Sequence, residues 1–241
     1  MQRLVIIPTY NERENVARMI DKVLSLEGNF HLLFVDDGSP DGTAAIIKER
    51  QTQQPQPQRI HLIERKGKLG LGTAYIAGFR WALEHGYDHI FEMDCDFSHN
   101  PDDLLRLDRR LSEDTDVVIG SRYVRGVNVV NWPLSRLLMS YFASKYVRTV
   151  TRMPVCDATA GFVGYRREVL QTLNLDKVQM IGYGFQIEMK YTAWRYGFKL
   201  AEESIIFIDR EAGTSKMSSG IFGEAFFGVL RLPWRGIGRN K

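Results

Sequence analysis

The sequence predicts an α/β protein with a mostly parallel central sheet flanked by helices. Through residue 122, short apolar runs rich in β-branched residues alternate with segments whose apolar residues recur at helical spacing. Several of the apolar runs end in acidic or polar residues. Because ligands of such sheets bind outside the carboxyl ends of the strands, these polar residues mark the expected site.

Five apolar runs are predicted as strands, over residues 4–7, 31–35, 60–63, 89–93 and 116–120. Helices are predicted up to about residue 26, and over 40–50, 73–85 and 101–111. Asn11, with Glu14 three residues later, has the form of a helix N-cap with a capping-box partner. The segment 51–58, rich in Gln and Pro, is predicted to be a surface loop.

The alternation stops after Arg122. Helices are predicted over 134–150 and from 184 to about 197, with a last strand region over 199–208 and a polar loop over 209–216. A glycine-rich loop, 67–72, lacks the endings of the known phosphate-binding motifs. Its glycines suit either close approach to a ligand or packing of a helix on a strand.

Composition excludes several classes of protein. A net charge of +3 over 241 residues, with no dense Lys/Arg stripe, does not indicate a nucleic-acid binder. Cys95 and Cys156 are too far apart for a metal-ligand motif and fit a reducing compartment. The N-terminal apolar run is too short for a signal peptide, and no run has the roughly 18 to 20 apolar residues of a membrane span. We therefore expect a cytoplasmic protein, at most attached to a membrane face.

Two carboxylates, Asp94 and Asp96, come directly after the apolar strand 89–93. Oxygen ligands at the carboxyl end of a buried strand suit Mg²⁺ or Mn²⁺, which in turn hold phosphate oxygens. The alternative is that both are turn residues, because Asp is common at strand ends.

Seven short motifs occur in an order that is specific as a set, although each alone is weak. They are Pro8-Thr9-Tyr10-Asn11-Glu12, Val35-Asp36-Asp37-Gly38-Ser39, Asp94-x-Asp96, Gly120-Ser121-Arg122, Asn131-Trp132-Pro133, Gly184-Phe185-Gln186-Ile187-Glu188, and Asp209-Arg210 with Ser215-Lys216. With this set the chain resembles glycosyltransferase family 2, and within it the polyprenol-phosphate (dolichol-phosphate) mannosyltransferases, over nearly its whole length. The resemblance implies the nucleotide-diphospho-sugar transferase (GT-A) fold and an inverting, metal-dependent transfer of mannose from GDP-mannose to a polyprenyl or dolichyl monophosphate.

The resemblance also implies roles for particular residues. The donor nucleotide sugar would contact Pro8, Tyr10, Glu12, Val35, Asp37, Asp94, Cys95, Asp96, Arg210 and Lys216. The divalent cation, Mg²⁺ or Mn²⁺, would be held by Asp94 and Asp96, with Ser98 where many relatives carry Gln. The acceptor phosphate would meet Arg122, Arg136, Ser140 and Arg210, and the catalytic residues would be Asp96, Arg122 and Arg210.

We expect residues 1–217 to form the catalytic domain and 218–241 an amphipathic tail. The helix 134–150 and the tail would bring a peripheral enzyme to the cytoplasmic face of a membrane. Three alternatives stay open: the same machinery using UDP-glucose, a non-catalytic nucleotide-sugar binder, and a nucleotidyltransferase of similar architecture. The sequence leaves the oligomeric state open.

Overall fold

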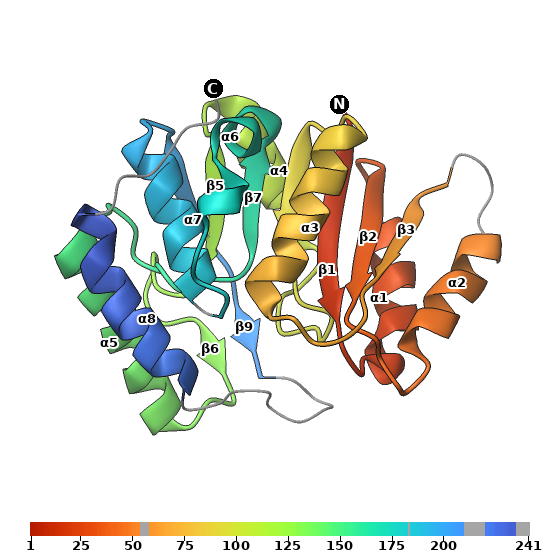
Figure 1. Ribbon diagram of the computed structural model, residues 1–241, viewed down its shortest axis with the longest axis horizontal. Coiled ribbons are helices and arrows are strands. Elements are labelled where there is room, and N and C mark those ends of the chain that lie inside the picture. The colour runs from red at the N-terminus through yellow and green to blue at the C-terminus, as the bar shows by residue number, and fades with distance from the viewer. Residues whose placement is uncertain (54–57, 183, 210–219, 235–241) are drawn as a thin grey trace.

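The computed structural model describes residues 1–53, 58–182, 184–209 and 220–234. Its central sheet has seven strands in the order β3-β2-β1-β4-β7-β5-β8, and a small second sheet pairs β6 with β9 (Figure 1). The strands are β1 (Arg3–Thr9), β2 (Phe30–Asp36), β3 (Ile60–Glu64), β4 (His89–Glu92), β5 (Val117–Ser121), β6 (Val129–Val130), β7 (Val163–Arg166), β8 (Leu200–Ser204) and β9 (Phe207–Ile208). The helices are α1 (Arg13–Leu24), α2 (Thr43–Gln53), α3 (Leu71–Glu84), α4 (Asp103–Glu113), α5 (Leu134–Thr151), α6 (Arg167–Thr172), α7 (Gly184–Arg195) and α8 (Gly220–Arg231).

Strand direction places the functional side chains at one edge of the main sheet. β3, β2, β1 and β4 run parallel to one another, and β5 runs parallel to β8. β7 alone runs antiparallel, between β4 and β5. Because β7 opposes both neighbours, β4 and β5 run in the same direction, so the residues that follow them emerge at the same edge. The predicted α/β class with a mostly parallel sheet is confirmed.

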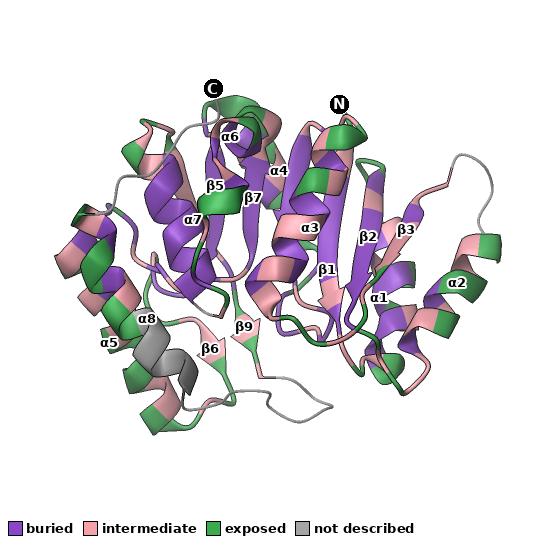
Figure 2. Ribbon diagram, viewed as in Figure 1, coloured by how far each residue is buried: buried purple, intermediate pink, exposed green. Residues whose placement is uncertain are grey.

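The sheet is covered on both faces because its strands are apolar on both sides. Leu4 and Ile6 of β1 pack in the core with α3, α6 and α7, whereas Val5 and Ile7 pack with α1, α2 and α4. This period-two alternation produces two separate cores, one on each face. Figure 2 shows the central strands as almost entirely buried.

Helices α5 and α8 lie side by side at one end of the molecule, beyond α7 (Figure 1). The predicted helix 134–150 is confirmed, since α5 spans Leu134–Thr151. Val229 of α8 and Leu232 after it are buried in the core that α7 also contributes to. Most of α5, by contrast, is exposed or half-buried (Figure 2).

One local prediction is wrong, and another strand region is divided into two strands. Asn11 does not cap α1: its backbone takes the left-handed conformation (φ 56°), and the helix begins at Arg13 with Glu12 as the N-cap residue. The last strand region, 199–208, is not continuous, because β8 ends at Ser204 and β9 pairs with β6 in the second sheet. The chain leaves the main sheet there, and Ile205 fills the core beside Gly120.

Candidate active site

The turns that follow β1 and β2 are tied together at the carboxyl edge of the sheet. Buried Asp36 accepts hydrogen bonds from the hydroxyls of Thr9 at 2.9 Å and Ser39 at 2.6 Å. The backbone N–H of Glu12 donates to the Thr43 hydroxyl at 3.0 Å. Asp36 is thus a structural residue of the turn, and it fixes the relative position of the two predicted donor segments.

Several predicted donor residues lie at this edge. Pro8 pairs in register with Val35 of β2, and Lys68 of the glycine-rich loop lies over the Tyr10 ring, 5.1 Å from its centroid. Asp37 accepts from Arg65 Nε at 2.6 Å. Burial raises the pKa of Asp37 above its ordinary value, against the opposing effect of Arg65.

Two other predicted donor residues are core residues in this structure. Val35 has no exposed surface, and Cys95 is buried in the core on the α1 and α4 face. Val35 packs in the core on the α3 face, so the two side chains lie on opposite faces of the sheet. The predicted contacts of Arg210 and Lys216 lie outside the described residues.

The glycine-rich loop answers one question that the sequence left open. A Cβ at Gly72 would approach the Phe185 ring to 2.8 Å, and Gly70 has a positive φ of 100° beside Ile181. These two glycines are therefore needed where α3 packs against α7 and the segment before it. Helix packing accounts for them without a ligand.

Asp94 and Asp96 follow β4 and carry the predicted metal site. The Asp94 side chain is 42% exposed, whereas Asp96 and Ser98 are buried. The backbone N–H of Ser98 donates to Asp96 Oδ1 at 3.1 Å, which orients that carboxylate. Among the described residues, no three His, Cys, Asp or Glu side chains gather closely enough to hold a metal ion alone. Two hard oxygen donors fit Mg²⁺ or Mn²⁺ when phosphate oxygens and water complete the coordination.

His99 supports this turn from inside and was not predicted. Its Nδ1 accepts from the Asp94 backbone N–H at 3.4 Å and lies 3.8 Å from Asp94 Oδ2, and its ring stacks on Phe162. Burial lowers the pKa of His99 to about 4, so the ring is neutral near pH 7. A neutral ring with an unprotonated Nδ1 matches the observed acceptor role.

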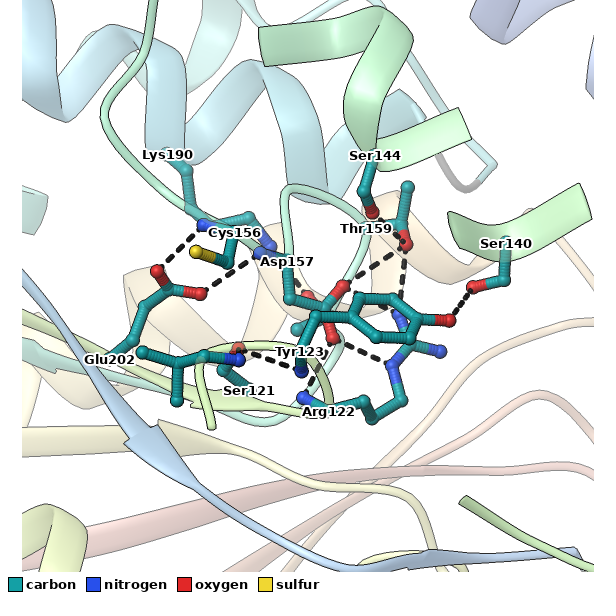
Figure 3. A network of polar contacts seen from close by, with 12 residues as sticks. Ser121, Arg122, Tyr123, Ser140, Ser144, Cys156, Asp157, Thr159, Lys190 and Glu202 are labelled. Carbon is teal, nitrogen blue, oxygen red and sulfur yellow. Dashed lines mark hydrogen bonds and ion pairs between the residues drawn. The ribbon is translucent and has the colours of Figure 1, made fainter. Parts of the chain in front are cut away.

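Arg122 emerges after β5 and is held by a buried carboxylate (Figure 3). Its backbone N–H and Nε donate to Asp157 Oδ2 at 3.0 and 2.7 Å, and its Nη2 donates to Asp157 Oδ1 at 2.6 Å. Nη2 also donates to the Thr159 hydroxyl at 2.8 Å. Burial alone would raise the pKa of Asp157, but the charge and hydrogen bonds of Arg122 lower it below its ordinary value. The guanidinium is therefore fixed in one orientation.

The other predicted acceptor residues lie close by, on or against α5. Arg136 forms an ion pair with Asp209 at 2.8 Å, and its guanidinium carbon lies 4.2 Å from the centroid of the Trp132 ring. The guanidinium carbon of Arg122 lies 5.5 Å from the same ring centroid. Ser140 accepts from the Tyr123 hydroxyl at 2.8 Å. The structure thus brings Arg122, Arg136 and Ser140 into one neighbourhood. Arg210 belongs to the chain segment outside the described residues.

Sequence reasoning missed several charged residues beneath this neighbourhood. Glu92, Asp157, Lys190 and Glu202 were not predicted, and the first three are fully buried. Burial raises the pKa of Glu92 to about 8 and lowers that of Lys190 to about 8. The available signal was a charged residue inside an otherwise apolar strand or helix, since an ionisable group there needs a specific partner.

The sheet, with its carboxylates and arginines at the carboxyl edge, defines the class of protein as the GT-A nucleotide-diphospho-sugar transferase fold. A crystal structure of glucosyl-3-phosphoglycerate synthase from Mycobacterium tuberculosis with Mn²⁺, UDP and glucosyl-3-phosphoglycerate matches with a TM-score of 0.65 at 18% identity, covering 96% of this chain and 78% of that one. A further crystal structure, described as a mycobacterial protein, matches at 0.69 and 17% identity, covering 95% and 74%. At these identities the likeness shows the fold.

The chain belongs to glycosyl transferase family 2, whose profile matches residues 4–173. It is 46% identical over 233 residues to polyprenol monophosphomannose synthase from Mycolicibacterium smegmatis, covering 97% of this chain and 87% of that protein. It is 43% identical over 241 residues to undecaprenyl-phosphate mannosyltransferase from Micrococcus luteus, covering 98% of each. The fold and family predicted from the ordered motifs are confirmed.

Proposed function

We propose that this glycosyltransferase transfers mannose from GDP-mannose to a polyprenyl monophosphate, with inversion, to give polyprenyl-phosphate β-mannose and GDP. The observation that carries the proposal is the identity of 43% and 46%, over nearly the whole chain, to two proteins named for mannose transfer to polyprenyl phosphates. The arrangement of carboxylates and arginines at one sheet edge supports it chemically.

On the donor side, Asp94 and Asp96 would hold a divalent cation, Mg²⁺ or Mn²⁺. When bound, the cation neutralises the negative charge that develops on the departing nucleoside diphosphate. A solved protein of the same fold was crystallised with Mn²⁺ and UDP-glucose together, which supports a cation at this edge. The Ser98–Asp96 hydrogen bond holds the Asp96 carboxylate in place for that role.

On the acceptor side, a phosphate oxygen attacks the anomeric carbon of the sugar. The new bond joins that carbon to the acceptor oxygen, the bond to the donor phosphate breaks, and attack from the opposite side inverts the configuration. A phosphate monoester is already ionised near neutral pH, so the reaction needs no strong general base. It needs cations that bring two anionic groups together, and Arg122, Arg136 and Arg210 are proposed to supply them.

The identity of the donor is set by contacts in the first two turns. GDP-mannose is our choice, and UDP-glucose is the competing donor. Isothermal titration with GDP and UDP in the presence of Mn²⁺ separates the two, and tighter binding of UDP would reverse the choice.

The enzyme is proposed to act at the cytoplasmic face of a membrane, as a peripheral protein. Among the described helices, none is long and apolar enough to cross a bilayer. Exposed apolar side chains gather on the two adjacent helices α5 and α8, and they are Leu134, Leu138, Met139, Tyr141, Phe142, Phe226, Phe227 and Leu230. The sequence of α5 contains three basic residues and no acidic one, which suits an anionic lipid surface. Phe222 belongs to the predicted amphipathic tail, and its side chain lies outside the described residues.

Transfer of radiolabelled mannose from GDP-mannose to polyprenyl phosphate, with Mg²⁺ or Mn²⁺, tests the function directly. We expect Asp96→Ala to lower kcat by at least about a hundredfold, because an electrostatic contribution to the transition state is lost. Asp102→Ala is the matched control, since Asp102 is an exposed carboxylate in the same segment that pairs with Lys22 on the surface. The wild type failing to label the lipid, or both variants behaving alike, would refute the proposal.

A further inference from the structure

The segment 156–160, which we call the Asp157 loop, is fixed from two separate elements. Glu202 of β8 accepts from the backbone N–H groups of Cys156 at 2.6 Å and of Asp157 at 2.9 Å. Lys190 of α7 donates from Nζ to the Ala160 carbonyl at 2.5 Å. One carboxylate therefore holds the start of the loop, and one ammonium holds its end (Figure 3).

The loop in turn holds Arg122. Asp157 contributes both carboxylate oxygens and Thr159 contributes its hydroxyl to the guanidinium. The Thr159 hydroxyl also lies 3.4 Å from the Ser144 hydroxyl of α5. A shift of the loop would move Asp157 and Thr159 together, and the guanidinium would follow them.

Packing alone does not explain the charges behind the loop. Lys190 has no exposed surface, and burying an ammonium carries a large desolvation cost that an apolar side chain of similar shape would avoid. Asp157, Glu92 and Glu202 oppose that cost by favouring the charged form of Lys190, although burial, with a smaller effect of Arg122, still lowers its pKa to about 8. A buried charged network that costs stability can be explained if its hydrogen bonds hold the groups that it contacts, here the Asp157 loop, in one conformation.

We propose that Glu202 and Lys190 are positioning residues, which orient Arg122 toward the acceptor phosphate by fixing the Asp157 loop. The inference rests on the proposed function, in that Arg122 is taken to face the acceptor. Glu202 acts through two main-chain N–H groups, and Lys190 through one carbonyl. Neither role requires contact with a substrate.

The test compares Glu202→Gln with Glu203→Gln. Glutamine keeps the size of Glu202 but replaces one acceptor oxygen with a donor, so one of the two loop N–H groups loses its partner. Glu203 is the neighbouring carboxylate on β8, and it faces Arg106 and Arg110 at 3.9 Å instead of the loop. Lys190→Met is a second variant that keeps the length and removes the charge.

For Glu202→Gln we expect KM for polyprenyl phosphate to rise about tenfold, because a displaced guanidinium meets the phosphate poorly. KM for GDP-mannose and the Kd of GDP should stay within about twofold, since the donor residues lie on other turns. Lys190→Met should likewise raise KM for polyprenyl phosphate and leave KM for GDP-mannose unchanged, and Glu203→Gln should match the wild type in both. The Nε–H signal of Arg122 in NMR spectra, assigned with Arg122→Lys, should shift in the first two variants and not in the control.

Equal increases of both KM values would mean general loosening of the fold and would overturn the positioning role. So would an unchanged acceptor KM and Arg122 signal in the folded Glu202→Gln and Lys190→Met proteins. A wild-type enzyme that leaves polyprenyl phosphate unlabelled refutes the proposed function instead. In that case the Arg122 signal alone decides whether these residues orient the guanidinium.

Discussion

In the candidate metal site, Asp96 and Ser98 are joined by a hydrogen bond within a tight turn. Ser98 is buried, and its main chain makes two hydrogen bonds: its N–H donates to Asp96 Oδ1 at 3.1 Å, and its carbonyl accepts from the Ile208 N–H at 3.2 Å. These bonds connect the turn to β9 and to the acceptor side of the site. The main chain of Ser98, which any residue except proline would supply, is the part that orients the carboxylate.

Ser98→Ala is therefore expected to leave metal activation nearly unchanged. The concentration of Mn²⁺ that gives half-maximal transfer should stay within about threefold of the wild-type value, whereas loss of a side chain that supports the metal shell would raise it about 10- to 100-fold. The half-maximal concentration is measured from the initial transfer rate at increasing Mn²⁺ concentrations, with Ser112→Ala as a surface control. A large increase specific to Ser98→Ala would establish the hydroxyl as a ligand.

Whether a residue was predictable depended on where its partner lies in the sequence. Asp94 and Asp96 could be predicted as metal ligands because they follow an apolar strand and form part of an ordered set of motifs. Asp157 was missed because its partner Arg122 is 35 residues away, and only the folded sheet brings them together. The same holds for Glu202 and the Asp157 loop, 45 residues apart.

At the scale of elements, β2 and β3 carry a pair of histidines beside α3. His31 Nδ1 lies 2.9 Å from the Tyr87 hydroxyl, and the same hydroxyl lies 3.3 Å from His61 Nε2. The His61 ring is 4.7 Å from that of Trp81. Burial, together with the neighbouring His31 and His85, lowers the pKa of His61 to about 4, and burial is the largest of these causes.

This arrangement predicts acid sensitivity that is separate from catalysis. Between pH 6.5 and about 4 the unfolded chain binds a proton at His61 that the folded protein does not, so stability is lost as pH falls through that window. After discounting for partial exposure, the loss is about 1–2 kcal/mol. Urea unfolding at pH 7 and pH 4.5 should show a smaller pH effect in His61→Gln than in the wild type, and an intermediate effect in His85→Gln, which removes one of the neighbouring groups that lower the pKa of His61. Identical pH dependence in all three proteins would rule out this role for His61.

Elements were predictable where periodicity was long and local. The five parallel strands and the helix 134–150 were found because buried strands and amphipathic helices leave repeating apolar patterns. The two-residue strand β6 leaves no such pattern, and it exists only because it pairs with β9, which is distant in the sequence. Asn11 was misjudged because its backbone N–H donates to Ser39 of the next turn at 3.0 Å, a contact that local capping rules do not include.

At the scale of the whole molecule, the site is divided between two parts of the sheet. The proposed donor turns follow β1 and β2, while Arg122 follows β5, and β4 delivers the two aspartates between them. Beyond the proposed acceptor side lie α5 and α8 (Figure 1), and these two helices carry exposed apolar side chains. A groove of about 480 Å³ beside α5 is lined by Lys145, Arg148 and Arg152 along with Tyr123 and Tyr141. Apolar and cationic side chains thus lie together on the face where a lipid-linked phosphate would arrive.

This layout predicts that binding to vesicles depends on α5 and not on exposed apolar residues in general. Phe142 is 57% exposed on α5, and Leu69 is 59% exposed in the glycine-rich loop. We expect Phe142→Gln to lower the fraction of protein that floats with anionic phospholipid vesicles by about three- to tenfold, because a large apolar side chain no longer enters the acyl boundary. Leu69 is exposed to a similar fraction but lies away from α5, so Leu69→Gln should float like the wild type.

Salt separates the two contributions to that binding. Raising ionic strength screens the attraction between the cations of α5 and anionic headgroups, so flotation of the wild type should fall. The remaining flotation at high salt reports the apolar contribution, and Phe142→Gln should remove most of it. If Phe142→Gln and Leu69→Gln lower flotation equally, or neither does, then α5 is not the surface that meets the membrane. The acceptor would then have to reach Arg122 from another side of the molecule.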